Sequence, residues 1–214
     1  MTDLRAALVA ACRRLDGLGF VAATDGNLSC RLGPDRLLVT PSGRSKGELE
    51  AGDLLVTDLE GRVVEGNGRP SSELPMHLFV YRRRDDVGAV VHAHPPAASG
   101  FAVAGIDLTE PVMPEIVLTV GPIPLARYAT PSTADVPRSL EPLIDGHQAF
   151  LLESHGVLCV GRHLTEALHR MERVEHVARV DLVARLLGRP RALSEGEVLA
   201  LFDAARALRG EREP

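Results

Sequence analysis

The chain has 214 residues, of which 45% are hydrophobic and 25% charged, a composition typical of soluble globular proteins with enough apolar material for one domain. Its 24 basic and 29 acidic side chains give a net charge of -5, which argues against a nucleic-acid partner and a membrane-surface role. The three cysteines are widely spaced, no apolar run reaches transmembrane length, and no signal peptide begins the chain. We therefore expect a cytoplasmic protein in which residues 1–214 form a single domain.

The first part of the chain is predicted to combine helices with short strands. Apolar residues at helical spacing predict a helix over residues 3–18. A second helix is expected to begin with a serine N-cap at Ser71-Ser72 and to end in a solvated basic run, Arg82-Arg83-Arg84. Strands are expected in the segments 23–31, 37–40, 54–57, 61–64 and 87–94.

The second part of the chain is predicted to be similar. Buried strands are expected at 116–120, 149–152 and 156–160. Helices are expected from Thr133 to about Leu143, over 163–187, and from a capping box at Ser194 and Glu197 to about Leu208. In the 163–187 helix, Glu175 belongs to the polar side, and the apolar side is formed by Leu164, Leu168, Met171, Ala178, Leu182 and Leu186. Because strands crowd the middle and helices bracket them, the pattern favours an α/β domain of mixed layers.

Two histidines stand at the end of the strand predicted over residues 87–94. His92 and His94 are two positions apart, so their imidazoles lie on the same face of the strand, and Pro95-Pro96 ends it. Two convergent imidazoles make half of a transition-metal site. The alternative is that one histidine belongs to the core and the other to the surface.

Two more residues can complete such a site. His155 lies in a short turn between buried strands, where its side chain would be held rigidly. Glu73 lies at a helix start and can either complete the coordination or act as a base. The spacing in the sequence allows Glu73, His155 and the two histidines to meet, but only the tertiary structure can bring them together.

Three turns offer neutral hydrogen-bond donors. Gly26-Asn27, Ser42-Gly43 and Ser71-Ser72 present hydroxyl, amide and free backbone N–H groups, and the last pair is expected at a helix N-terminus. Each is also an ordinary turn or cap. Together with a metal half-site, they predict a phosphate pocket that uses no lysine.

Six motifs resemble one known family in their order and spacing. They are Gly26-Asn27-Leu28-Ser29, Thr40-Pro41-Ser42-Gly43, Pro70-Ser71-Ser72-Glu73, His92-Ala93-His94, Pro124-Leu125-Ala126-Arg127-Tyr128-Ala129-Thr130 and Ser154-His155-Gly156. From about residue 3 to 187 the chain resembles the class II aldolase/adducin family, and it is most similar to the branch of L-fuculose-1-phosphate aldolases. Several motifs in order are far more specific than any one of them.

The resemblance implies a three-layer α/β/α domain around a central, largely antiparallel sheet, assembled as a homotetramer with active sites between subunits. It implies that His92, His94 and His155 hold one divalent metal per chain, preferably Zn²⁺, with Mn²⁺ or Co²⁺ as alternatives. Glu73 matches the acid/base carboxylate, which also ligates the metal when substrate is absent. The positions that match the substrate phosphate site are Gly26, Asn27, Ser42, Gly43, Ser71 and Ser72.

The reaction that the resemblance implies is cleavage of a ketose 1-phosphate, similar to L-fuculose 1-phosphate, into dihydroxyacetone phosphate and an aldehyde through a metal-stabilised enediolate. Glutamate at position 73, where the related 4-epimerases carry aspartate, favours an aldolase. The alternatives are a sugar-phosphate 4-epimerase, a dehydratase or a decarboxylase on the same scaffold, and a non-catalytic adducin-like interaction module.

The chain departs from its fuculose-phosphate relatives in its tyrosines. Those relatives use tyrosines near the metal and in the C-terminal tail, whereas this chain has only Tyr81 and Tyr128. Glu115 lies near the first of the missing positions and is a candidate for the missing acid, with a structural salt bridge or strand-edge role as the equal alternative. The identity of the aldehyde is therefore left open.

Overall fold

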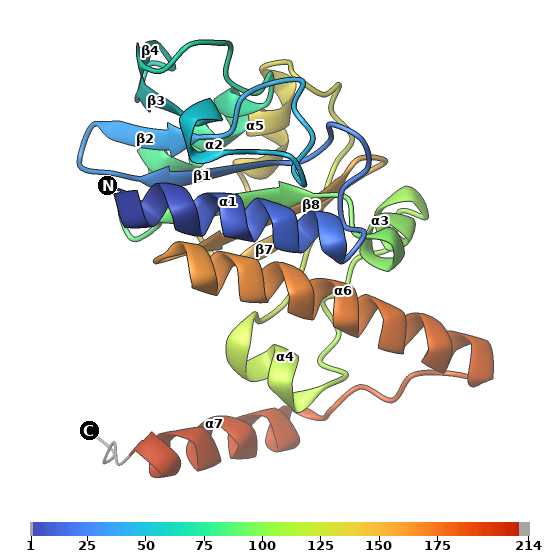
Figure 1. The fold of residues 1–214 in the computed structure, drawn as a ribbon. Coiled ribbons are helices and arrows are strands. Elements are labelled where there is room, and N and C mark those ends of the chain that lie inside the picture. Colours follow the sequence, from blue (N-terminus) through green and yellow to red (C-terminus); the bar gives the residue numbers. More distant parts are fainter. Residues whose placement is uncertain (1, 210–214) are drawn as a thin grey trace.

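One mixed sheet carries the fold, as the computed structural model shows for residues 2–209 (Figure 1). The strands run in the spatial order β4-β3-β2-β1-β5-β8-β7-β6, and every pairing is antiparallel except that of β6 with β7. The strands are β1 Asn27–Arg31, β2 Arg36–Val39, β3 Leu55–Asp58, β4 Val63–Glu65, β5 Ala89–Ala93, β6 Leu125–Ala126, β7 Ala149–Leu152 and β8 Gly156–Gly161.

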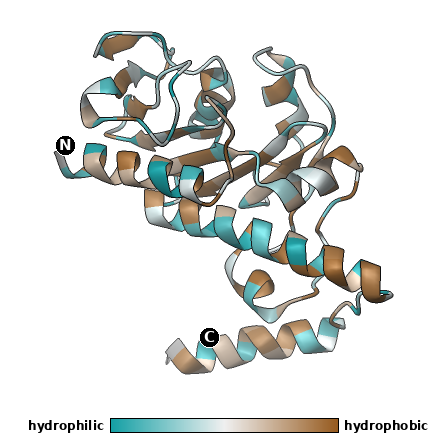
Figure 2. Cartoon of the chain, turned by 45° about the vertical axis from the view of Figure 1, so that its right-hand side comes forward, coloured by the Kyte–Doolittle hydropathy of each residue, from teal (hydrophilic) through white to brown (hydrophobic). Residues whose placement is uncertain are grey.

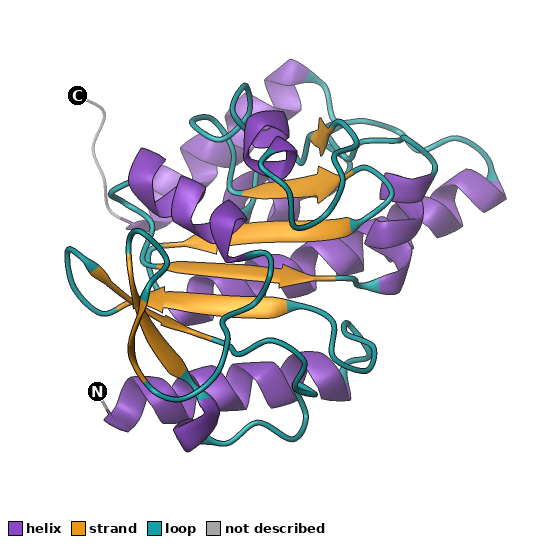
Figure 3. Cartoon of the chain, turned by 90° about the horizontal axis from the view of Figure 1, so that it is seen from above, coloured by secondary structure: helices purple, strands orange, loops and turns teal. Residues whose placement is uncertain are grey.

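Helices cover both faces of this sheet (Figure 3). They are α1 Thr2–Gly17, α2 Leu74–Arg83, α3 Pro96–Val103, α4 Pro114–Thr119, α5 Asp135–Leu140, α6 Leu164–Leu187 and α7 Glu195–Arg209, with a short 3-10 turn at Ala51–Asp53. None of the described helices has the length and apolar character needed to cross a membrane.

Two hydrophobic cores lie on opposite faces because successive strand residues point to opposite sides. On β5, Val91 packs in the core formed with α1, α3 and α6, whereas Val90 packs in the core formed with α2 and α5. On β8, Cys159 packs in the same core as Val91, and Leu158 packs in the same core as Val90. The expected three-layer α/β/α class with a largely antiparallel sheet is thus confirmed.

The expected strand at 116–120 is wrong, because these residues belong to helix α4 and its C-cap. Pro114 occupies the first helical turn, where its missing N–H costs nothing. Ile116 and Val120 are buried four residues apart, which is helical spacing. A short apolar run of this kind does not distinguish a strand from a buried helix by its periodicity.

Two helix boundaries also differ from the expectation. The N-cap of α2 is Glu73, without a side-chain cap, because the hydroxyl of Ser71 accepts the backbone N–H of Glu73 before the helix begins. Helix α5 ends at Leu140, and Pro142 has no N–H with which to continue the ladder. The capping box at the start of α7 is confirmed, since Ser194 Oγ accepts from Glu197 N and Glu197 Oε2 accepts from Ser194 N.

Three expectations about burial are wrong. Arg84 is 8% exposed, and its guanidinium donates to the carbonyls of Ile144 and His147. Glu175 on α6 is 1% exposed, although its position in the sequence predicts the polar side of the helix. Leu186 is 78% exposed, because the C-terminal part of α6 extends past the sheet, where Figure 2 shows hydrophobic residues on it.

Candidate metal and phosphate site

The three histidines singled out in the sequence converge at one end of the sheet. His92 is on β5, His94 follows that strand, and His155 lies in the turn between β7 and β8, the latter an antiparallel neighbour of β5. One ring nitrogen from each lies within 4.8 Å of the others, and the ring centroids are 4.7 to 5.3 Å apart. Ring nitrogens gathered this closely can bind one metal ion together.

A glycine makes this approach of the turn to the strand end feasible. A Cβ atom on Gly156 would lie 2.5 Å from Cδ2 of His94 and 2.7 Å from the carbonyl oxygen of Ala93. Ser154, just before His155, has φ of 55°, a left-handed conformation that non-glycine residues rarely adopt. Local strain of this kind is common where a turn must present a functional side chain.

Glu73, at the N-cap of α2, reaches the histidines. Its Oε2 lies 3.2 Å from Nε2 of His92, and its Oε1 lies 3.1 Å from Nε2 of His155. Burial alone would raise the pKa of Glu73, but the adjacent His92 and His155 outweigh it and hold that pKa well below its usual range. The carboxylate is therefore ionised, yet its buried Oε1 makes no hydrogen bond.

The hydrogen bonds show which ring nitrogen of His92 faces the cluster. His92 Nδ1 is 2.9 Å from the carbonyl oxygen of Val157 and donates to it, so Nε2 is the nitrogen on the side of Glu73. That Nε2 faces His94 Nε2 at 3.1 Å as well as the Glu73 carboxylate. Burial, together with the rings of His92 and His155, lowers the pKa of His94 to about 4, which keeps this ring neutral near pH 7.

These acceptor atoms fit a divalent cation. Three ring nitrogens and a carboxylate oxygen without a hydrogen-bond donor face one another, and a cation between them would satisfy all of them. The bond from His92 to the Val157 carbonyl is the kind of outer contact that orients metal-binding histidines. The donor set of three imidazoles and one carboxylate suits Zn²⁺, Mn²⁺ and Co²⁺ alike.

The three turns expected to bind phosphate lie side by side. Ser71 N donates to the carbonyl of Thr40, and Ser42 N donates to that of Arg69, so the second and third turns are joined. Thr40 Oγ1 accepts from Leu28 N, which joins them to the turn of Gly26 and Asn27. Gly26 has φ of 72°, and a Cβ there would lie 2.6 Å from Val21 Cγ1, so the tight turn requires glycine.

Asn27 has a contact that the sequence did not suggest. Its amide nitrogen donates to Glu73 Oε2 at 2.9 Å, so one side chain of the predicted phosphate site touches the predicted acid/base residue. Behind it, His77 on α2 is 2% exposed, and its Nε2 lies 2.6 Å from Oδ1 of Asn27.

The sequence did not indicate that Lys46 lies beside the predicted phosphate turns, because buried lysines are rare and the neighbouring residues are typical of an ordinary turn. It is 1% exposed and donates to the carbonyls of Thr24 and Arg44, which flank the first two turns. Burial lowers its pKa. Lys46 thus fixes these turns against each other without contacting the histidines.

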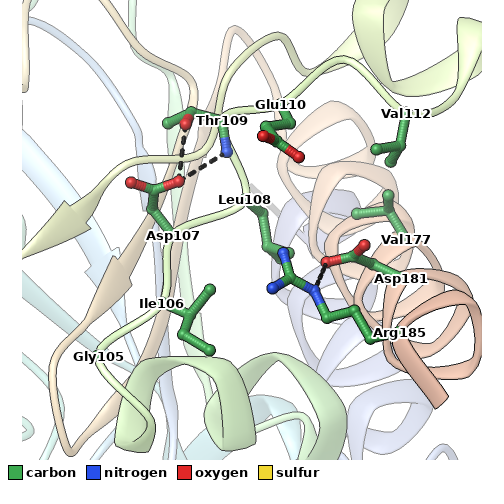
Figure 4. Close-up of a pocket in the computed structure, with 10 residues that line it drawn as sticks. All are labelled: Gly105, Ile106, Asp107, Leu108, Thr109, Glu110, Val112, Val177, Asp181 and Arg185. Atoms are coloured by element: carbon green, nitrogen blue, oxygen red, sulfur yellow. Dashed lines mark hydrogen bonds and ion pairs between the residues drawn. The ribbon is translucent and has the colours of Figure 1, made fainter. Parts of the chain in front are cut away.

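Glu115 stands apart from this cluster. It lies on the exposed side of α4, and within residues 2–209 its carboxylate makes no hydrogen bond or ion pair with the histidines or Glu73. A cavity of about 380 Å³ lies away from the histidines, between α6 and the segment 105–112 (Figure 4). Its lining includes the ion pair of Asp181 with Arg185 and none of the histidines.

The chain matches a family model described as Class II Aldolase and Adducin N-terminal domain over residues 6–182. It is 32% identical to a 5-deoxy-D-ribulose 1-phosphate aldolase of Bacillus thuringiensis, with 91% of each chain covered. It is 35% identical to a methylthioribulose-1-phosphate dehydratase of Methylococcus capsulatus, covering 87% of this chain and 96% of that protein. It is 34% identical to a 3-oxo-tetronate 4-phosphate decarboxylase of Pectobacterium atrosepticum, with 77% of each chain covered.

Solved structures agree with these relatives. An L-fuculose 1-phosphate aldolase superposes with a TM-score of 0.89 at 30% sequence identity, covering 96% of this chain and 97% of that one. Enzymes of different reaction types thus share this scaffold and most of its length. The chain belongs to the class II aldolase/adducin family.

Proposed function

We propose that this protein is a metal-dependent class II aldolase that cleaves a ketose 1-phosphate into dihydroxyacetone phosphate and an aldehyde. The observation that carries the proposal is the contact of Glu73 with two of three histidines whose ring nitrogens lie within 4.8 Å of one another. A scaffold without catalysis has no need of this set of residues, so an adducin-like interaction module is the weaker hypothesis.

In this proposal His92, His94 and His155 hold one divalent cation, preferably Zn²⁺, and Glu73 is a fourth ligand before substrate binds. When bound, the cation supplies Lewis-acid stabilisation of negative charge on the carbonyl side of the ketose. The chain contributes a rigid ligand set, because His92 is completely buried and anchored to β8. Imidazoles bind a metal in their neutral form, so they would leave the charge of the cation undiminished.

The substrate phosphate would bind to the joined turns. The proposed positions are Gly26, Asn27, Ser42, Gly43, Ser71 and Ser72. Ser42 and Ser72 are exposed, and Gly43 has open space around it, so these groups are accessible to an anion. Fixing the phosphate at one end would place the ketose carbons next to Glu73, since Asn27, which follows Gly26 in the first turn, donates to Glu73.

Glu73 would move the proton on the dihydroxyacetone phosphate side. Cleavage breaks the bond between the third and fourth carbons, the fourth-carbon hydroxyl loses its proton as the aldehyde forms, and the third carbon gains a proton. As a carboxylic acid Glu73 can donate that proton, and as a carboxylate it can remove it in the reverse reaction. Its position beside the histidines suits this role.

Because Glu73 is ionised at rest, it would take the proton that it donates from solvent water. The remaining proton, from the fourth-carbon hydroxyl, requires an acceptor that returns it to solvent, and Glu115 is the candidate. Because Glu115 is exposed on α4 and separate from the histidines of its own chain, this role needs a neighbouring subunit. The proposal therefore includes a homo-oligomer, a tetramer by family resemblance, whose active sites lie between subunits.

The second candidate reaction is dehydration or decarboxylation of a related sugar phosphate. It is favoured by the relatives named as methylthioribulose-1-phosphate dehydratase and 3-oxo-tetronate 4-phosphate decarboxylase, which are as similar to this chain as the aldolase is. A 4-epimerase is a further alternative, weakened by glutamate at position 73.

A substrate panel tests the proposal. Purified protein, with its metal content measured, is incubated with ketose 1-phosphates that include 5-deoxyribulose 1-phosphate and fuculose 1-phosphate, and dihydroxyacetone phosphate is detected with a coupled enzyme. Product from at least one ketose, lost in His92→Ala, supports the aldolase. Loss of water from a thio-sugar phosphate, release of carbon dioxide, or turnover of a pentulose 5-phosphate alone would replace it with the dehydratase, decarboxylase or epimerase.

A further inference from the structure

A buried chain of hydrogen bonds leads from the inner part of α2 to Glu73. The hydroxyl of Tyr81 donates to the backbone carbonyl of Ser29, and the Ser29 hydroxyl lies 2.6 Å from Nδ1 of His77. Nε2 of His77 is 2.6 Å from Oδ1 of Asn27, whose amide nitrogen donates to Glu73 Oε2 at 2.9 Å. From Tyr81 to Asn27 each member is at most 5% exposed, so no solvent competes for these bonds.

The donor and acceptor in each of these hydrogen bonds follow from the Glu73 carboxylate at one end of the series. A carboxylate only accepts hydrogen bonds, so the side of Asn27 that faces it must be the NH₂ group. Oδ1 of Asn27 then faces His77 and requires a donor, which is Nε2–H. A buried neutral imidazole with hydrogen on Nε2 has a bare Nδ1, and that nitrogen takes the hydrogen of the Ser29 hydroxyl.

The elements explain why these residues meet. Asn27 and Ser29 alternate on β1, so both side chains point to the face that α2 covers. On α2, His77 and Tyr81 are four residues apart and lie on one side of the helix. Glu73 precedes them by another four residues, at the N-cap, so one face of α2 meets one face of β1.

We propose that His77 is a positioning residue whose Nε2–H holds the Asn27 amide in the orientation that lets Asn27 donate to Glu73. The carboxylate is thereby held toward His92 and His155. The opposite amide orientation would place Oδ1 against the carboxylate and NH₂ against Nε2–H, and both contacts are repulsive. The catalytic consequence rests on the proposed function, whereas the orientation itself does not.

The first test is the tautomer of His77 in the wild-type protein. Nitrogen-15 NMR of the histidine rings, assigned with His77→Gln, distinguishes hydrogen on Nε2 from hydrogen on Nδ1. We expect hydrogen on Nε2 and none on Nδ1 at pH 7. Hydrogen on Nδ1, or a doubly protonated ring, would overturn the proposal without any variant having to fold or turn over substrate.

The second test compares His77→Leu, which removes the donor, with His77→Gln, whose side-chain amide can donate from the place of Nε2. The matched control is His176→Gln on the exposed side of α6. Zinc affinity is measured by competition with a chelator. We expect His77→Leu to weaken it by about 10–100-fold, as is usual for outer contacts of metal ligands, and His77→Gln to restore most of it.

The order of the variants separates positioning from packing. If His77 only fills space, the apolar leucine should preserve zinc affinity at least as well as the polar glutamine does, and that result would refute the proposal. Where the protein has aldolase activity, kcat should follow the same order with KM changed less than kcat. If no ketose phosphate is cleaved, the proposed function fails, while the tautomer and zinc measurements still decide the role of His77.

Discussion

Asn27 on β1 and His92 on β5 are direct partners across the antiparallel pair. Side chains of such partners point to the same face of a sheet, and this face is the one that α2 covers. The register therefore brings the predicted phosphate turn beside the predicted metal ligand, with Glu73 in contact with both residues. A shift of one residue would turn either side chain to the opposite core.

Glu73→Gln should separate metal binding from catalysis. Glutamine keeps the size of the side chain and one oxygen, so we expect the metal content to stay near that of the wild type. Loss of the proton-transfer group should reduce carbon–carbon cleavage by about 10²–10⁴-fold. Coupled assay of dihydroxyacetone phosphate and metal analysis check this together. Undiminished cleavage would remove Glu73 from the acid/base role.

Removal of the metal should lower stability through linkage. A cation that binds only the folded state stabilises it by about 3 kcal/mol at a free concentration of 100 times Kd. We expect a chelator to lower the Tm of the wild type and to leave that of His92→Ala unchanged, because His92 is the completely buried member of the triad. A chelator effect of equal size in both proteins would contradict the assigned ligand.

The stability of the metal-free protein should fall as the pH drops below about 6.5. Burial lowers the pKa of His77 to about 3, so the unfolded chain takes up a proton on this ring that the folded chain does not. Between pH 8 and pH 5 this removes about 2 kcal/mol from the free energy of unfolding.

Urea denaturation of the wild type and of His77→Gln at pH 8 and pH 5 measures how much of the change in unfolding free energy is due to His77. The difference between pH 8 and pH 5 should be smaller in the variant, which has no titrating ring at this position. Since Glu73 also has a lowered pKa, its stabilisation is present above the pKa of the unfolded carboxyl and is lost only at more acidic pH. An identical pH dependence in the two proteins would show that His77 does not contribute.

Glu175→Ala should destabilise the protein by more than an ordinary surface change. The Glu175 carboxylate accepts the backbone N–H groups of Ala97 and Ala98 and so caps α3, whose own N-cap Pro95 provides no side-chain bond. Because one buried and one partly buried donor lose their partner, we expect a loss of about 2 kcal/mol.

Glu172→Ala on the same helix is the matched control for Glu175→Ala. It removes an ion pair with Arg14, a half-exposed side chain, so its cost should stay below about 1 kcal/mol. Denaturant unfolding compares the two variants. Zinc affinity should also fall in Glu175→Ala, because α3 begins two residues after His94. Equal unfolding free energies would refute the capping role.

Gly156→Ala should disturb the histidine cluster, because the new methyl group would lie 2.7 Å from a backbone oxygen of Ala93 as well as against the His94 ring. Such a contact forces the backbone to move, at a cost of about 1–3 kcal/mol. Gly146→Ala is the control, since nothing lies within 4 Å of the position that its new methyl group would take. Zinc affinity and Tm should fall in the first variant only.

Local patterns in the sequence determined most of the elements and the candidate residues. Strand alternation separated the two cores, as at Val90 and Val91, and the capping box at Ser194 marked the start of the last helix. These features depend on neighbours within a few positions along the chain, so a single sequence carries them. The full set of site residues was predicted from the resemblance of the six ordered motifs to the family.

Only the tertiary structure decided which distant groups meet. The run at 116–120 is a helix whose Ile116 packs in a core that distant segments form, and Glu175 is buried because α3 begins beside it. The side-chain amide of Asn27 donates to Glu73, 46 positions away. Each outcome depends on contacts between segments far apart in the sequence, which no local periodicity encodes. The two histidines at the end of β5 could be recognised from their spacing. Glu73, His155 and the buried hydrogen bonds of His77 are brought to them by the packing of α2 and β8 against the strands of the sheet.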